Sequence, residues 1–156
     1  MQAEIHLIHR SEFYQIRDFR CACVECSTSG LEQCEQFCIC FVRKGYYEQL
    51  VFRKKQEMHF GRMLVSKPGI EYVIRHIDHQ PDLCTSIGFT DQFYELVKDQ
   101  FSAEAAWFFR NPDLHSLLLT SPPKTEYLHQ QILSAVKKGQ RLEVDDLVIR
   151  LVENVM

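Results

Sequence analysis

Hydrophobic and polar residues alternate with a period of two over the first part of the chain, up to about residue 89. Phe19, Cys21 and Cys23 occupy alternate positions, and so do Tyr72 and Ile74, as in strands with one buried face. Residues 37–42 form a continuous apolar run, which is typical of a strand buried on both faces. Short runs of these two kinds recur between turn signals, at residues 14–23, 37–42, 46–52, 58–65, 71–76 and 83–89. The pattern predicts an antiparallel β-barrel or sandwich over residues 1–89.

After Thr90 the period changes to three and four residues, which is the spacing of amphipathic helices. Thr90 can cap a first helix, and residues 103–109 predict a second, short and apolar one. A longer helix is expected from Pro122 to a stop at Gly139, followed by a last helix with heptad-like apolar spacing over residues 144–155. Residues 90–156 are therefore expected to be helical. The predicted fold is α+β, with an antiparallel barrel followed by a C-terminal helical hairpin.

The predicted hairpin carries a wide apolar stripe that needs a partner surface. The stripe either covers the barrel or pairs with a second copy of the chain, and both can hold. We therefore expect residues 90–156 to pack on the barrel and to form the interface of a homodimer. Because the helical pattern is still running at Met156, we also expect the chain to be part of a longer protein.

Composition and charge narrow the classes of function. The 156 residues fit one domain of ordinary globular composition, with 46% hydrophobic residues and a formal net charge of −3. The longest basic run is residues 53–55, so this segment lacks the basic face with which a domain grips nucleic acid. No apolar stretch reaches membrane-spanning length, and the first ten residues lack the apolar core of a secretory signal. A cytoplasmic protein is expected.

Cysteine is the unusual feature of the composition. Seven cysteines are present, at positions 21, 23, 26, 34, 38, 40 and 84, and six of them fall within residues 21–40. An odd number in a cytoplasmic protein argues against a closed disulfide framework. Cys23 and Cys26 have the spacing of one arm of a zinc knuckle, but a second such pair is missing. Three interpretations stay open: thiols that only pack in strands, a metal site, or a thiol switch.

The remaining chemistry-bearing residues do not predict an enzyme. The histidines form no close pair of the kind that metal-dependent enzymes use, because His76 and His79 stand in an expected loop. Neither a phosphate-binding glycine-rich loop nor a nucleophile elbow is present in the sequence. The acidic pair Asp145 and Asp146 is expected on a helix surface. His76 is the histidine of most interest, since it precedes the strand that carries Cys84.

Several segments, in this order and spacing, resemble the sensor domain of AraC-type bacterial transcription regulators. They are residues 41–46 (FVRKGY), 64–72 (LVSKPGIEY), 75–76 (RH), 82–85 (DLCT), 126–129 (EYLH) and 144–155. The resemblance covers nearly all of residues 13–155. Ile77 departs from the family pattern, in which a proline follows the histidine.

This resemblance implies a cupin-like barrel that binds an effector, followed by helices that form a dimer. In full-length members two helix-turn-helix units follow and read DNA, and this chain contains neither. A cysteine at position 21 and a histidine near position 38 are found in one subgroup. If Cys38 replaces that histidine, Cys21, Cys38, His76 and Cys84 are expected to converge inside the barrel as ligands of a metal, with zinc as the candidate. Cys23 and Cys26 are the rival source of ligands.

Three functions follow from these observations. The leading expectation is that the chain is the ligand-sensing and dimerisation domain of an AraC-family regulator. Its effector would be a small molecule or a metal. The regulator would bind DNA only through the helix-turn-helix domain that is absent from this chain. The second is a module in which the cysteines themselves sense metal or redox state. The third is a cupin-type metalloenzyme, which is disfavoured because residues 38–52 offer no His-x-His motif. We expect binding and no catalysis.

Overall fold

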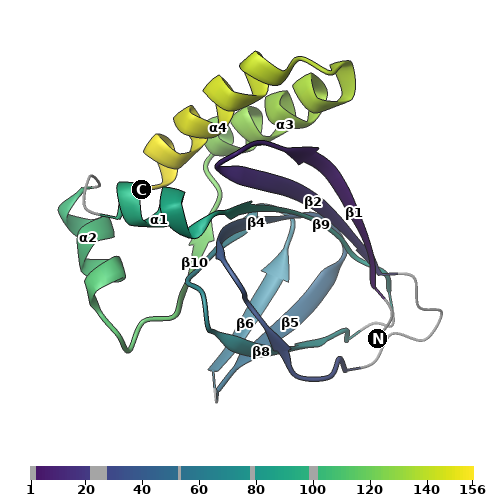
Figure 1. The fold of residues 1–156 in the computed structure, drawn as a ribbon. Helices are drawn as coiled ribbons and strands as arrows, with labels where there is room; N and C mark the ends of the chain where they lie inside the picture. The colour runs from purple at the N-terminus through teal and green to yellow at the C-terminus, as the bar shows by residue number, and fades with distance from the viewer. Residues whose placement is uncertain (1–2, 22–27, 53, 78–79, 99–101) are drawn as a thin grey trace.

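The computed structural model describes residues 3–21, 28–52, 54–77, 80–98 and 102–156. These residues form ten strands and four helices (Figure 1). The strands are β1 (Ala3–Arg10), β2 (Tyr14–Cys21), β3 (Glu32–Gln33), β4 (Phe37–Lys44), β5 (Tyr46–Val51), β6 (Lys54–His59), β7 (Arg62–Ser66), β8 (Glu71–Arg75), β9 (Leu83–Phe89) and β10 (Ser116–Thr120). The helices are α1 (Asp91–Val97), α2 (Ala103–Arg110), α3 (Pro123–Lys138) and α4 (Arg141–Val155).

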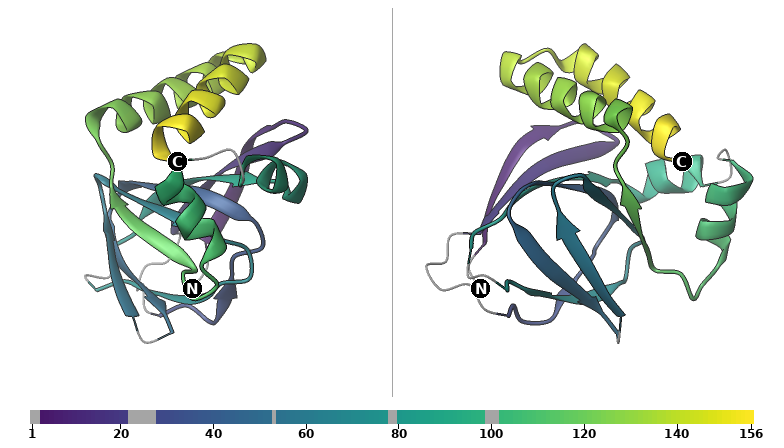
Figure 2. Two further views of the ribbon diagram at one scale, coloured as in Figure 1. Left: turned by 90° about the vertical axis from the view of Figure 1, so that its left-hand side faces the viewer. Right: turned by 180° about the vertical axis from the view of Figure 1, so that it is seen from behind.

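The strands form two antiparallel sheets that face each other. The larger has the order β1-β2-β9-β4-β7-β10, and the smaller has the order β3-β8-β5-β6. Figures 1 and 2 show the two sheets curving round a common interior, with α3 and α4 outside the larger sheet. The predicted α+β fold, an antiparallel barrel followed by a helical hairpin, is confirmed.

Side-chain alternation in the larger sheet separates two environments. In β4, Phe37, Ile39 and Phe41 are buried in the cluster that includes the C-terminal helices. Cys38 and Cys40, on the alternate positions, line the barrel interior. β9 repeats the arrangement, since Ile87 belongs to the helix-facing cluster and Ser86 lines the interior. Because alternate side chains of a strand lie on opposite faces of the sheet, the bulky apolar side chains face the helices and the thiols face the barrel interior.

The helical hairpin covers the outside of the larger sheet. Leu128, Ile132, Leu147 and Leu151 of α3 and α4 share one buried cluster with the outward residues of β2, β4 and β9. The turn between the helices is closed at Gly139, whose φ of 72° is left-handed and suits glycine, as the sequence predicts. The apolar stripe therefore covers the barrel, which is one of the two roles expected for it.

Two polar contacts add to this packing. Of the acidic pair expected on the helix surface, Asp146 is exposed as predicted, whereas Asp145 is half-buried and its Oδ1 accepts a hydrogen bond of 2.5 Å from the Tyr14 hydroxyl of β2. The His129 ring of α3 stacks on Phe41 of β4, with centroids 4.3 Å apart and planes inclined by 14°. Together they fix the orientation of the hairpin on the sheet.

The two shorter helices extend from one side of the barrel (Figure 1). Thr90 caps α1 as predicted, with its side chain accepting from the Phe93 amide at 3.3 Å. Ser102 caps α2 in the same way, accepting from the Ala105 amide at 3.2 Å. Within the described residues, no helix combines the length and the apolar character needed to cross a bilayer.

Two predictions of secondary structure are wrong in detail. Residues 116–120, expected within a helical region, form β10, which pairs with β7 along its whole length. The run Leu117, Leu118 and Leu119 has no periodicity of its own, so pairing with β7 decides its conformation, and β10 becomes the edge strand of the larger sheet. Residues 58–65, expected as one strand, are split between β6 and β7 by a turn in which Gly61 has a φ of 83°.

Candidate functional site

The barrel interior contains a cavity of about 110 Å³ between the two sheets, here called the inner cavity. Apolar side chains such as Phe19, Leu64 and Ile74 form much of its wall. The five cysteines in the described residues also line it: Cys21, Cys34, Cys38, Cys40 and Cys84. The inner cavity is thus an apolar chamber with an unusually high thiol content.

Next to the inner cavity lies a second hollow of about 390 Å³, here called the outer groove. Both share a set of lining residues: Phe19, Glu32, Cys34, Cys38, Tyr72 and Ser86. Arg17, Glu32 and Glu35 bring charge to the outer groove. Together the two hollows reach the size of small-molecule sites, about 300–1,000 Å³, with an apolar inner part and a polar mouth.

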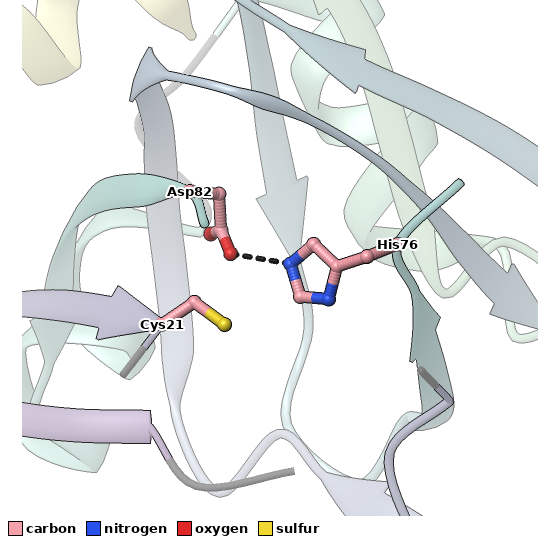
Figure 3. Close-up of side chains that lie close together, drawn as sticks. All are labelled: Cys21, His76 and Asp82. Atoms are coloured by element: carbon pink, nitrogen blue, oxygen red, sulfur yellow. Dashed lines mark hydrogen bonds and ion pairs between the residues drawn. The ribbon is translucent and has the colours of Figure 1, made fainter. Parts of the chain in front are cut away.

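A cluster of three polar side chains lies at one end of the inner cavity (Figure 3). Cys21 ends β2, His76 follows β8, and Asp82 precedes β9, so three separate segments meet there. The Cys21 amide donates to the Asp82 carbonyl at 3.1 Å, which joins two of the segments. Gly45, with a φ of 89°, packs so tightly here that a Cβ would lie 2.8 Å from the Asp82 Cα. A left-handed glycine is therefore part of how the cluster is built.

Within the cluster, His76 and Asp82 are joined directly. His76 Nε2 lies 2.5 Å from Asp82 Oδ1, while the histidine side chain is fully buried and the aspartate is 12% exposed. His76 Nδ1 is buried without a hydrogen-bond partner among the described residues. One ligand atom each from Cys21, His76 and Asp82 lies within 4.8 Å of the other two.

Cys84 lies beside this cluster. Its Sγ is 3.3 Å from Asp82 Oδ2 and 3.5 Å from the Tyr47 hydroxyl. A hydrogen bond with Cys40, together with burial, raises the pKa of the Cys84 thiol well above its usual value. Burial, with smaller contributions from the neighbouring thiols, likewise raises the pKa of Tyr47. In the metal-free protein Cys84 is therefore a neutral thiol at physiological pH.

A second thiol pair lies elsewhere on the cavity wall. Cys34 Sγ and Cys38 Sγ are 3.6 Å apart. The hydrogen bond from Cys38 lowers the pKa of the Cys34 thiol, and the same bond raises the pKa of Cys38. The pair therefore combines a thiol whose pKa is lowered with one whose pKa is raised.

The structure divides the four metal ligands that the sequence predicts. Cys21, His76 and Cys84 gather around Asp82, whereas Cys38 lies beside Cys34. In the β4–β9 ladder Cys38 pairs with Gly88 and Val42 pairs with Cys84. That register separates the two cysteines by four residues along the sheet, roughly 13 Å at strand spacing.

Asp82 was not among the predicted ligands. The one indication in the sequence was that Asp82 stands two positions before Cys84, a cysteine in a predicted strand, and such a spacing alone is weak evidence for a metal ligand. The rival pair Cys23 and Cys26, and also His79, lie outside the described residues. Among the residues that the structure describes, the Cys21–His76–Asp82 group is the one set of potential ligands close enough to share an ion.

Comparison with known proteins places the fold. No protein-family model and no curated protein matches the sequence. Among solved structures, ToxT from Vibrio cholerae strain SCE256, with bound unsaturated fatty acid, matches 92% of this chain and 53% of its own, with a TM-score of 0.64 and 9% identity. The P21 crystal form of ToxT matches 86% of this chain and 57% of its own, with a TM-score of 0.60 and 10% identity.

A Cupin 2 conserved barrel domain protein from Salinispora arenicola CNS-205 also matches the chain. It covers 63% of this chain and 84% of its own, with a TM-score of 0.50 and 10% identity. The chain has a cupin-like fold. It spans about half the length of ToxT, and the ToxT match extends beyond the barrel into the helices.

Proposed function

We propose that this chain is the ligand-sensing domain of a transcription regulator of the AraC type. The observation that carries the proposal is the pair of neighbouring hollows, the inner cavity and the outer groove, which share lining residues in a barrel that bears a helical hairpin on its outer face. ToxT, an AraC-family regulator, shares this fold over 92% of the present chain, and its structure holds an unsaturated fatty acid. The proposed role is binding, without catalysis.

The chemistry of the two hollows favours a ligand with an apolar body and one anionic group. The inner end of the apolar body, about four methylene groups, fits the inner cavity, where Phe19, Leu64 and Ile74 supply the wall, and the rest of the body extends towards the outer groove. Arg17 in the outer groove is the cation that an anionic group requires, although Glu32 and Glu35 share that groove and restrict where the group can sit. A long-chain unsaturated fatty acid meets both requirements.

The sheet itself can carry the signal from ligand to helices. Cys40 faces the inner cavity, and the next residue of β4, Phe41, stacks on His129 of α3. In β9, Ser86 lines the cavity and Ile87 lies in the helix-facing cluster. A ligand that favours one arrangement of β4 and β9 thereby favours one placement of the hairpin.

Dimerisation and DNA binding complete the proposed role. The main apolar stripe of the hairpin is occupied by the barrel, so a second copy of the chain would meet other residues. Leu142 and Ile149 of α4, seven residues apart and therefore on one helix face, are 86% and 52% exposed. In the proposed regulator, a separate domain binds DNA. A measurement of the molecular mass of the protein in solution tests whether this chain forms a dimer.

Thermal unfolding in the presence of oleate tests the proposal. At a free oleate concentration one hundred times the dissociation constant, binding stabilises the folded state by about 2.7 kcal/mol. For a chain of this length, that raises Tm by roughly 5–10 °C. Acetate, which has the same charge without the apolar body, is the matched control and is expected to leave Tm unchanged. Equal effects of the two ligands, or no shift with oleate, would count against the proposed ligand class.

A further inference from the structure

The cluster at the end of the inner cavity has the composition of a site for a soft divalent cation. Cys21 offers sulfur, His76 offers imidazole nitrogen and Asp82 offers carboxylate oxygen, which are the three ligand types that zinc takes in proteins. A thiolate with an imidazole selects zinc over calcium and magnesium, which prefer sites made of oxygen atoms. The three ligands come from segments far apart in sequence, so the fold creates the grouping.

The ligand atoms lie near the spacing of a zinc site, with a hydrogen bond between His76 and Asp82 where an ion would sit. Bonds of about 2.0–2.3 Å in a tetrahedron put neighbouring ligand atoms roughly 3.3–3.8 Å apart. The 2.5 Å between His76 Nε2 and Asp82 Oδ1 is shorter than this, and the three ligand atoms together span up to 4.8 Å. Displacement of the proton between His76 and Asp82 by a cation requires a movement of roughly 1 Å to reach the tetrahedral spacing.

Burial makes a purely structural role for these groups costly. The His76 side chain is fully buried and its Nδ1 has no partner among the described residues. Asp82 brings a carboxylate to the same place, and the Cys84 thiol lies 3.3 Å from its second oxygen. Three donor groups within 4.8 Å of one another, with the Cys84 thiol beside one of them, exceed what a single histidine–aspartate hydrogen bond needs.

We propose that Cys21, His76 and Asp82 bind one Zn²⁺ ion, and that Cys84, whose Sγ lies 3.3 Å from Asp82 Oδ2, moves towards the ion to become the fourth ligand. The ion would tie the end of β2 to the segments after β8 and before β9, and so hold one end of the barrel together. Cys21, Asp82 and Cys84 also line the inner cavity, so the zinc site shares a wall with the proposed ligand chamber. Zinc is therefore measured in the absence of oleate and oleate in the zinc-free protein, so that failure of one proposal is distinguished from failure of the other.

Metal content and affinity test the site. The purified protein is stripped with a chelator, and Zn²⁺ is returned and measured by elemental analysis and by competition with a chromophoric chelator. We expect one zinc per chain. Loss of a group that merely supports a ligand costs about 10–100-fold in affinity, so Cys21→Ser, His76→Ala and Asp82→Asn should each weaken binding by at least that factor. Co²⁺ in place of zinc should give a thiolate charge-transfer absorption that Cys21→Ser diminishes.

The controls are cavity cysteines outside the cluster and the cysteines of residues 22–27. Cys34→Ser and Cys40→Ser should keep wild-type affinity, and so should the double variant Cys23→Ser/Cys26→Ser. Asp82→Asn keeps the size of the side chain, so it reports on the ligand even if His76→Ala unfolds. Absence of stoichiometric zinc, or zinc that survives Cys21→Ser and Asp82→Asn, overturns the proposal. Loss of zinc in the Cys23→Ser/Cys26→Ser variant alone also overturns it.

Discussion

Replacement of Leu151 by alanine is expected to lower the free energy of unfolding by about 2–5 kcal/mol. Leu151 lies on α4, is fully buried, and belongs to the same cluster as Ile39 and Phe41 of β4. Removal of its side chain would leave a void between the hairpin and the sheet, because neighbouring side chains refill such a space only in part. Urea denaturation of both proteins measures the difference.

Leu142 supplies the matched control for this prediction. It lies on the same helix but is 86% exposed in a single copy of the chain, so at a protein concentration at which the chain is a monomer Leu142→Ala should change the free energy of unfolding by no more than about 0.5 kcal/mol. If the two variants lose similar small amounts, the hairpin is not packed on the barrel. If both lose several kcal/mol at higher protein concentration, an interface between copies of the chain covers Leu142.

Phenylalanine in place of Ser86 is expected to prevent oleate from entering the barrel. Ser86 lies where the inner cavity meets the outer groove, and it lines both. A phenyl ring has the size of benzene, which fits a cavity of about 150 Å³, so it would fill the 110 Å³ available. Exclusion of about four methylene groups forfeits roughly 3 kcal/mol, which weakens binding roughly 100-fold or more. Isothermal titration with oleate gives the two dissociation constants.

Ser134→Phe makes the same chemical change on the exposed surface of α3. It should leave the dissociation constant for oleate within about twofold of wild type, since surface changes away from a site cost little. Equal loss of binding in both variants would indicate that oleate binds on the helices. Retained binding in Ser86→Phe would show that the inner cavity is not where the acyl chain lies.

The change of periodicity at Thr90 was sufficient to predict the class of fold. The alternation before it and the helical spacing after it locate most elements, and Thr90 and Gly139 act as the predicted helix cap and stop. Local patterns could not predict β10, because residues 116–120 become a strand only beside β7. The hairpin that splits residues 58–65 depends on one glycine, Gly61, whose left-handed φ the apolar pattern hides.

The candidate site was predictable only in part, because it depends on strand register. Composition identified thiols and His76 as the chemistry to follow, and Cys21, His76 and Cys84 do meet near one end of the barrel. The pairing of Val42 with Cys84 then places Cys38 four residues away along the ladder. Asp82 belongs to the cluster because the segment before β9 packs against Gly45. That contact joins segments that are distant in sequence, so no local pattern predicts it.

The crystal structure of the protein with oleate is the most direct test of the central claim, that the barrel interior receives an apolar ligand. We predict electron density for the acyl chain between the two sheets, in contact with Leu64 and Cys40, and the carboxylate in the outer groove near Arg17. Density for oleate only on the surface of α3 and α4, above an empty inner cavity, would contradict the proposed function.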